Sequence, residues 1–496
     1  MMWERRNTDR MTIGGIGRAR GERHLRCAQC ARVRTRGTPV ALDRRPGYRQ
    51  FQVIAVKSLS GTLLMAAFTG IAVAGAVSGS LDSSFGRGGR AFVSFSGSDT
   101  ASGVAVQRGG GVLVSGRVGG RFSLVRFDRR GRLDRAFGSG GLVREPVGAD
   151  PEEGPVRVAL QPDGKIVLAG TTGDLNRDRR LGDGALAVYR LLPDGKPDPS
   201  FGSRGIVLLR RGDELLGTEL AIDRAGRIVV VIRFNGLNRG GLLVRRLTTR
   251  GRLDLTFGHH GEQEVRFGTQ SFLGSATVDR EGRVYVAGDD FERRMLSVLR
   301  LTSRGSLDSG FGDGGIARLP NHAVLALPTA VAVQRDGRVL LAGVERFPGT
   351  TAPTPCGYCI FLTLGRLTLG GRPDRTFGEA GVVHTKLELT PSARVGLALQ
   401  RDGRIVVASG IRSGRSSSFL LVRLLRTGAF DSSFGDHGFA VTDMHSAKRK
   451  DNEATALAIA GDGRIVVAGR SARDELEGGG QRGRVQFRFA VARFLP

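Results

Sequence analysis

Two cysteine pairs are the first places in this sequence where metal chemistry can be sought. Cys27 with Cys30, and Cys356 with Cys359, have the C-x-x-C spacing that zinc sites use. More than 320 residues separate the pairs, so we do not expect a shared zinc ion. In an oxidising compartment Cys356 and Cys359 can instead form a small local disulfide.

An acidic segment resembles the start of a calcium loop. Asp174, Asn176 and Asp178 stand at alternate positions, as calcium ligands do in such loops. The glycine and the glutamate that the loop requires further on are replaced by Arg179 and Ala185. We therefore expect a solvated loop without calcium.

The sequence holds no recognisable catalytic motif. It has no H-E-x-x-H, no G-x-S-x-G and no phosphate-binding loop. The doublet His259-His260 directly follows Phe257-Gly258 and has no recurring acid or thiol nearby, so we interpret it as a turn variant. We expect no catalytic residue, no cofactor and no metal site.

One phrase containing an acid, D-x-x-F-G-x-x-G, recurs seven times at intervals of 52 to 66 residues. Its positions are Asp82, Phe85, Gly86, Asp134, Phe137, Asp198, Phe201, Asp254, Phe257, Asp308, Phe311, Asp374, Phe377, Asp431 and Phe434. Seven carboxylates can ring a metal, but a metal site does not need seven copies. A structural role explains the motif: the aspartate accepts backbone amide hydrogen bonds in a turn. The phenylalanine fills the gap between sheets, and the glycines adopt conformations closed to other residues.

A second phrase, also present seven times, places strands around these motifs. It consists of an apolar run, a polar turn with glycine and a β-branched run, as in LQRDGRIVVASG (399–410), which is typical of a hairpin. In the sixth unit we expect strands at 381–389, 395–400, 404–410 and 418–425, followed by a connection between units at 427–438. No long amphipathic helix is predicted from 80 to 496.

These repeats predict an all-β fold: a seven-bladed β-propeller of four-stranded antiparallel blades over residues 80–496. The repeat motifs start near residues 82, 134, 198, 254, 308, 374 and 431. An open β-solenoid is the alternative, although its coils are usually shorter. The first motif has no strand before it and the last strand, 488–496, has no motif after it. The ring is therefore expected to close there, with Asp82 near Phe494.

The repeated phrases resemble a known family. VAVQRDGRVLLAG (331–343) and LSVLRLTSRGSLDSGFGDGG (296–315) are similar to the delta-60 repeat of bacterial, often exported, proteins. The resemblance covers residues 80–496 and implies a propeller of unassigned function, without catalytic residues. Two units depart from the pattern: 106–116 lacks the turn aspartate, and 222–232 lacks the glutamine and the closing glycine.

The N-terminal residues differ from the repeats. Residues 1–55 hold 13 arginines and no alternating pattern, and we interpret them as a non-native or disordered extension. Residues 56–76 contain Lys57, an apolar core and small residues before Ala76, which is typical of a cleaved signal peptide. We expect a secreted or cell-envelope protein; the alternative is membrane anchoring by an uncleaved segment.

The charge of +28 comes from 69 arginines and six lysines spread over every repeat. A GC-rich genome explains this composition, and attraction to an acidic polymer is the functional alternative. Nucleic-acid binding is not favoured, because lysines and interleaved aromatic residues are few.

We expect an exported, non-enzymatic binding or adhesion scaffold at the bacterial cell envelope. Its partner would be an acidic envelope polysaccharide or another surface protein, met by the variable loops 171–184, 344–359 and 470–486. The alternative is a polysaccharide lyase or hydrolase with a pocket at the channel mouth, and a passive surface layer is a third option. A cationic channel is predicted if the first strands line it, since they carry Arg144, Arg210, Arg266, Arg318 and Lys386.

Overall fold

The computed structural model describes fourteen segments of the chain, from Val77 to Pro496. They are residues 77–95, 99–145, 154–172, 185–210, 214–236, 239–268, 271–290, 295–319, 325–348, 358–390, 394–413, 416–444, 451–473 and 486–496. The extension 1–55 and the signal segment 56–76 lie outside them. No helix in the described part of the chain is long and apolar enough to cross a membrane.

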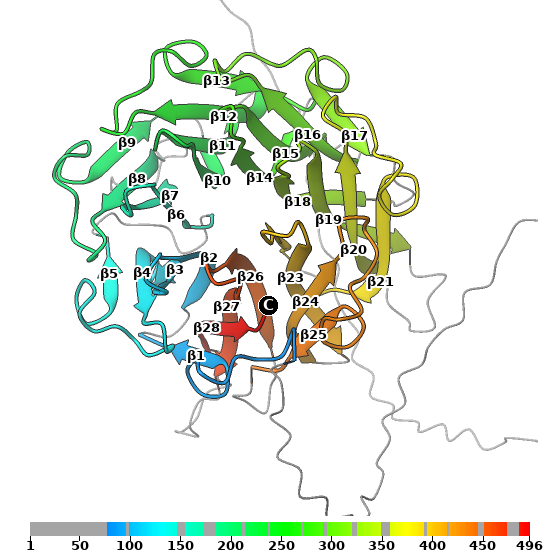
Figure 1. Cartoon of the computed structure of the whole chain (residues 1–496). Helices are drawn as coiled ribbons and strands as arrows, with labels where there is room; N and C mark the ends of the chain where they lie inside the picture. The colour runs from blue at the N-terminus through cyan, green and yellow to red at the C-terminus, as the bar shows by residue number, and fades with distance from the viewer. Residues whose placement is uncertain are drawn as a thin grey trace, which may run out of the picture. The chain divides into compact units, whose positions relative to one another are not determined.

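The described residues form seven four-stranded antiparallel sheets arranged in a ring, which confirms the predicted seven-bladed propeller (Figure 1). Blade 1 consists of β2 (Thr100–Val106), β3 (Val112–Val118), β4 (Arg121–Phe127) and β5 (Leu142–Arg144). Blade 2 consists of β6 (Arg157–Leu160), β7 (Ile166–Thr172), β8 (Ala185–Leu191) and β9 (Ile206–Arg210). Blade 3 consists of β10 (Glu214–Ile222), β11 (Ile228–Gly236), β12 (Arg239–Leu247) and β13 (Glu262–Val265).

The same order continues around the ring. Blade 4 consists of β14 (Ser271–Val278), β15 (Val284–Asp290), β16 (Leu296–Leu301) and β17 (Ile316–Leu319). Blade 5 consists of β18 (Leu325–Val333), β19 (Val339–Pro348), β20 (Tyr358–Leu367) and β21 (Val382–Glu388). Blade 6 consists of β22 (Gly396–Leu399), β23 (Ile405–Ser413), β24 (Ser416–Leu424) and β25 (Phe439–Thr442).

Blade 7 joins the two ends of the propeller. It consists of β26 (Asn452–Ile459), β27 (Ile465–Arg473), β28 (Gln486–Phe494) and the N-terminal β1 (Arg90–Val93). Antiparallel pairing places Ala91 opposite Val491, and a bridge joins Leu81 to Phe494. The first motif and its strand thus complete the last blade, as expected from the unmatched ends of the repeat.

The blade boundary differs from the one expected. The strand predicted first in the sixth unit is β21, which pairs with β20 and closes blade 5. Each D-x-x-F-G phrase therefore connects the third and fourth strands of one blade and does not link two blades. The error arose because the motif looks like a linker in sequence, although a short outer strand follows it in every blade.

Apolar residues seal every interface between neighbouring blades. The described core divides into seven clusters, and each one joins two adjacent sheets. Every cluster contains one motif phenylalanine, and all seven of these side chains are fully buried. Because both faces of each sheet need cover, the ring is the arrangement that buries them all.

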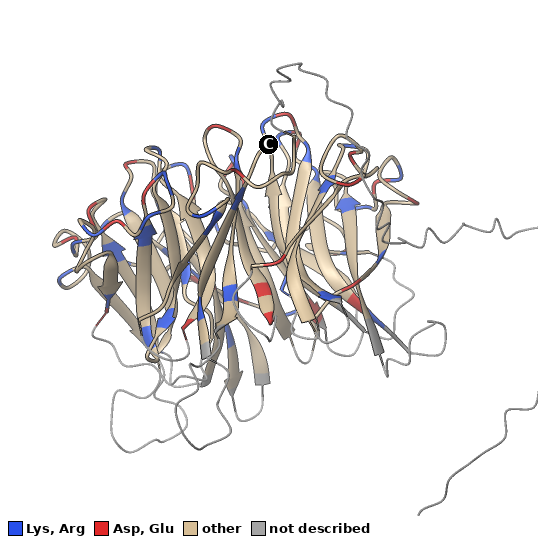
Figure 2. Cartoon of the chain, turned by 90° about the horizontal axis from the view of Figure 1, so that it is seen from below, with Lys and Arg blue, Asp and Glu red and all other residues tan. Residues whose placement is uncertain are grey.

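Two kinds of turn share one face of the propeller. The turn between the first two strands of each blade and the motif turn between the last two both lie there, and we call this the turn face. Figure 2 shows basic and acidic residues gathered along this rim. The C-terminal Pro496 also reaches it, next to the turn at Gly463.

Candidate functional site

The recurring motif contains an arginine that sequence reasoning missed. In all seven blades an arginine Nε lies 2.7–2.9 Å from the motif aspartate Oδ2, and the guanidinium stacks 4.3–4.7 Å from the centre of the motif phenylalanine ring. The arginines are Arg126, Arg190, Arg246, Arg300, Arg366, Arg423 and, paired with Asp82, Arg493. Six of them stand eight residues before the aspartate, a spacing that could have revealed them.

This unit also ties each blade to the next. Arg246, for example, donates from Nη1 to the carbonyl of Ser303 in blade 4 at 2.6 Å. The amide of Gly258 donates to the carbonyl of Arg304 in the same turn at 2.7 Å. The amide of Gly435 in blade 6 makes the equivalent bond to the carbonyl of Ser78, so the N-terminal segment supplies this turn of blade 7. The motif aspartates are thus used structurally, and no group of three metal-binding side chains occurs in the described residues.

The motif aspartates fall into two groups by what surrounds them. Five accept hydrogen bonds from a Ser or Thr two residues on and have a second cation within 3.9 Å: Asp82, Asp198, Asp254, Asp374 and Asp431. Burial opposes their ionisation, but these hydrogen bonds and cations outweigh it and lower the pKa of all five.

Asp134 and Asp308 form the second group. The residue two positions on is Ala136 or Gly310, which offers only its backbone amide, and only one basic side chain reaches each carboxylate within the described residues. Their side chains are 26% and 20% exposed, against 4–9% for the other five.

The motif requires glycine for a steric reason. At Gly258, φ is +55°, and an added Cβ would lie 2.1 Å from the carbonyl oxygen of Glu262. His260, two residues on, has φ of +53°, so the histidine doublet belongs to the turn.

Substitutions at these two turn positions should have opposite effects. Gly258→Ala should lower the free energy of unfolding by about 2 kcal/mol or more, because the left-handed conformation and the clash both oppose a side chain. His260→Gly should raise it by about 0.5–1 kcal/mol, because it relieves the same backbone strain without a clash. Urea denaturation of both variants measures this, and a stable Gly258→Ala variant would contradict the turn geometry.

Five arginines surround the central channel on the turn face. They occupy the same place in the inner turns: Arg108, Arg224, Arg280, Arg335 and Arg401. All five are exposed, and none forms an ion pair with a described residue. The acids beside them are paired instead, as Asp336 is with Arg338 and Asp402 with Arg404. We call this set the mouth arginines.

A hollow of about 780 Å³ lies among these turns. Four of the mouth arginines line it, together with Arg426 and turns from blades 3 to 6. Since the inner turns of four of the seven blades contribute, the hollow lies at the mouth of the channel. Asp279, Glu281 and Asp336 also line the hollow, but six arginines line it as well, so its net charge is positive and attracts anions.

A second charged group lies on the innermost strands. Arg157 donates from Nη1 to the carbonyl of Ser102 at 2.7 Å and from Nε to Glu219 at 3.0 Å, so it joins blades 1, 2 and 3. At the equivalent register position the other blades have only small residues: Gly103, Ser275, Ala330, Gly396 and Ala456. Burial raises the pKa of Glu219, although Arg157 opposes the rise.

The cationic channel suggested by the first strands is not observed. Those basic residues lie on the outermost strands or at their ends, away from the axis: Arg144, Arg210, Arg266, Arg318 and Lys386. The expectation failed because the strands preceding the inner hairpins belong to the previous blade. The positive charge of the channel mouth comes from the inner turns instead.

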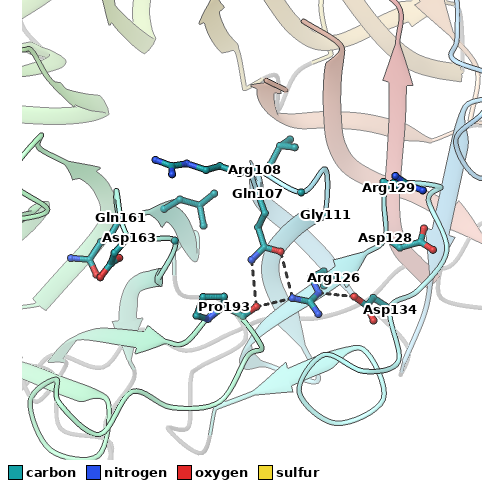
Figure 3. A pocket seen from close by; sticks show the side chains of 14 residues that line it. Gln107, Arg108, Gly111, Arg126, Asp128, Arg129, Asp134, Gln161, Asp163 and Pro193 are labelled. Carbon is teal, nitrogen blue, oxygen red and sulfur yellow. Dashed lines mark hydrogen bonds and ion pairs between the residues drawn. The ribbon is translucent and has the colours of Figure 1, made fainter. Parts of the chain in front are cut away.

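A separate pocket of about 580 Å³ lies on the turn face between blades 1 and 2 (Figure 3). It is lined by the partly exposed pair Arg126–Asp134, where Arg126 also donates to the carbonyl of Pro193 at 2.7 Å. Gly109 and Gly111 stand here in place of the Asp and Arg found in the inner turn of blade 6. The pocket therefore exists where the repeat departs from its own pattern.

A buried acid lies where blade 1 ends. The side chain of Glu145 is buried and has no hydrogen bond or ion pair with any described residue. Its backbone amide donates to Phe122, whose ring lies beneath the Arg117 guanidinium. Burial raises the pKa of Glu145 to about 7.

This raised pKa predicts a pH-dependent penalty on stability. From the unfolded value near 4.5 up to about 7, the folded state holds the proton more tightly, so stability falls as pH rises through that window. Glu145→Gln should therefore be more stable than the parent by about 3 kcal/mol at pH 8 and by almost nothing at pH 4. Urea denaturation of both proteins across this range tests it, and a difference independent of pH would contradict it.

Several predicted residues lie outside the described structure. They include the calcium-like loop at 174–178, most of the long variable loops and Cys356, so the disulfide with Cys359 stays a prediction.

Sequence comparison agrees with this architecture. Residues 161–201 and 400–434 match a family described as a domain of unknown function (DUF5122) beta-propeller. The chain is a β-propeller, and these two segments are similar to the repeats of a propeller family. No curated protein matches the sequence.

Several solved structures show low similarity to this chain. A PL25 ulvan lyase bound to -[GlcA(1-4)Rha3S]- is 11% identical, with 76% of this chain and 93% of that chain covered and a TM-score of 0.43. The N-terminal domain of Nup159 is 10% identical, with 84% and 98% covered and a TM-score of 0.39. A prolyl endopeptidase is 14% identical with a TM-score of 0.40; the match covers 79% of this chain and about half, 48%, of the endopeptidase chain.

Proposed function

We propose that this protein is an exported, non-enzymatic propeller that binds an acidic polysaccharide at the bacterial cell envelope, and that its units are delta-60 repeats. The mouth arginines carry the proposal. Four exposed guanidiniums that form no ion pair with a described residue line one hollow, and a polymer with regularly spaced carboxylates would neutralise several of them together. The signal-like segment 56–76 supports export.

The test is binding of polygalacturonate to the full chain, with neutral dextran as the control ligand. We expect salt-sensitive retention of polygalacturonate, measured by affinity electrophoresis, and none of dextran. A variant with Arg224, Arg280, Arg335 and Arg401 changed to serine should lose most of this retention.

A matched variant distinguishes binding at a specific site from attraction by the overall positive charge of the protein. Changing four exposed basic residues of the outer strands to serine removes the same charge: Arg144, Arg210, Arg266 and Lys386. It should retain polygalacturonate almost unchanged. Equal losses in the two variants would show that only the net charge matters and would overturn the proposed site.

A second function, a polysaccharide lyase or hydrolase, has one observation in its favour. Glu219, with its raised pKa, and Arg157 stand on the inner strands at a position where the other blades have small residues. In that case the full chain would release reducing ends or ultraviolet-absorbing unsaturated products from polygalacturonate, and Glu219→Gln would abolish their release. Binding without either product would favour the scaffold.

A further inference from the structure

We infer that the pocket between blades 1 and 2 binds a small basic zwitterion, with its guanidinium or ammonium group at Asp134 and its carboxylate near Arg108 and Arg129. This site shares only Arg108 with the mouth arginines of the proposed polysaccharide site, and it follows from comparing blade 1 with the other blades.

Comparison with the other blades shows which side chain is missing from this pocket. In blade 6, Arg404 of the inner turn places its Nε 2.9 Å from the motif Asp431, which also pairs with Arg423. In blades 5 and 7, Arg338 and Arg464 likewise pair through Nε with the motif aspartate of their own blade. Gly111 holds this position in blade 1.

The carboxylate of Asp134 therefore keeps acceptor capacity that its equivalents have used. Among the described residues, its Oδ1 accepts only from the amide of Ala136, at 3.1 Å, and its Oδ2 only from Nε of Arg126, at 2.8 Å. Asp254, by comparison, accepts from the amide and hydroxyl of Thr256 and from two guanidiniums. A ligand cation in the pocket would supply the second charge-assisted bond that five other blades contain.

The rest of the pocket wall indicates which chemical group the other end of the ligand carries. Arg108 and Arg129 both line the pocket and are exposed (Figure 3). Neither pairs with an acid among the described residues; Arg108 donates only to the carbonyl of Pro162, at 3.2 Å. A cation alone would be repelled by these two guanidiniums, whereas a carboxylate on the same molecule would pair with them. A basic amino acid, free or at a peptide C-terminus, has both groups.

The wall also holds an unused acceptor. Gln161, which lines the pocket, is 5% exposed, and its Oε1 is buried without a hydrogen-bond partner. Small shifts of this side chain would let a ligand N–H satisfy it, which removes the cost of an unpaired buried oxygen.

Isothermal titration of the full chain tests the site. The probes are L-arginine, agmatine, which lacks the carboxylate, N-acetyl-glycyl-L-arginine and L-glutamate. We expect L-arginine to bind, agmatine to bind more weakly and L-glutamate not to bind. Tighter binding of the dipeptide than of L-arginine would assign the site to a peptide C-terminus, and the reverse order to the free amino acid.

Gly111→Arg is the decisive variant, because it restores the side chain found in blades 5, 6 and 7. An added Cβ meets only Gln107 Oε1, at 2.9 Å, the end of a flexible side chain, so the variant should fold. It should weaken L-arginine binding by about tenfold or more, the loss expected for a hydrogen bond to a charged group.

Asp134→Asn should weaken binding to a similar extent. Asp308→Asn is its control. Asp308 also lacks a hydroxyl partner two residues on and a second basic partner among the described residues, but it lies in blade 4, so this variant should leave binding unchanged. Undiminished binding to Gly111→Arg, or no binding of L-arginine to the parent protein, would overturn the site. Equal or tighter binding of agmatine would overturn the zwitterion assignment.

Discussion

Arg246→Met should lower the free energy of unfolding by about 3–5 kcal/mol, because it leaves a buried carboxylate without its main partner. Arg246 is 2% exposed and lies 2.8 Å from Asp254, with further bonds to Thr256 and Ser303. Only Arg227, at 3.4 Å, would remain to neutralise Asp254. Urea denaturation followed by circular dichroism measures the change.

The same substitution in blade 1 is the matched control. Arg126 makes the equivalent pair with Asp134, but these two side chains are 16% and 26% exposed, so water can replace the lost partner. Arg126→Met should therefore cost about 1–2 kcal/mol. Equal losses at the two sites would show that burial of the pair does not determine its contribution.

Phe257→Ala should cost about 3–5 kcal/mol, the loss expected when a large side chain is removed from a packed core. Its ring is fully buried between blades 3 and 4, in a cluster with Val229, Val284 and Leu299. Because the Arg246 guanidinium stacks on this ring at 4.5 Å, the double variant should lose less than the sum of the two single losses.

Phe430→Ala serves as the comparison for an exposed ring. Phe430 lies in the motif turn of blade 6 and is 37% exposed, so its loss should cost about 1 kcal/mol or less. A Phe257→Ala variant that unfolds at the parent's urea concentration would mean that the motif rings do not seal the blades.

The ring was predictable because its evidence is periodic. A phenylalanine and two glycines at fixed offsets identify seven units, and Asp-Gly turns such as Asp402-Gly403 identify the hairpins. Blade boundaries were not predictable from the same pattern. The short outer strands, for example β25, have no distinctive composition, and only their pairing shows which blade they complete.

The motif arginines were harder to predict for a compositional reason. With 69 arginines in the chain, an arginine eight residues before six of the seven aspartates does not stand out. The pocket beside Gly111 shows another limit. The sequence shows that the inner turn of blade 1 lacks its aspartate. It does not show the resulting hollow, because that depends on how the side chains of the neighbouring turn pack.

Ring closure by the N-terminal strand is the central claim, and engineered cysteines test it most directly. Ala91 and Val491 face each other across β1 and β28, although 400 residues separate them. In a full chain with the four native cysteines changed to serine, Ala91→Cys with Val491→Cys should form an intramolecular disulfide on mild oxidation.

Mass spectrometry of tryptic peptides would identify that bond. Ala91→Cys with Ala342→Cys, whose second position lies on β19 of blade 5, is the control and should give no intramolecular crosslink. The account predicts the β1–β28 crosslink in the folded monomer. Its absence, or an equal yield from the control pair, would contradict a propeller sealed by its two ends.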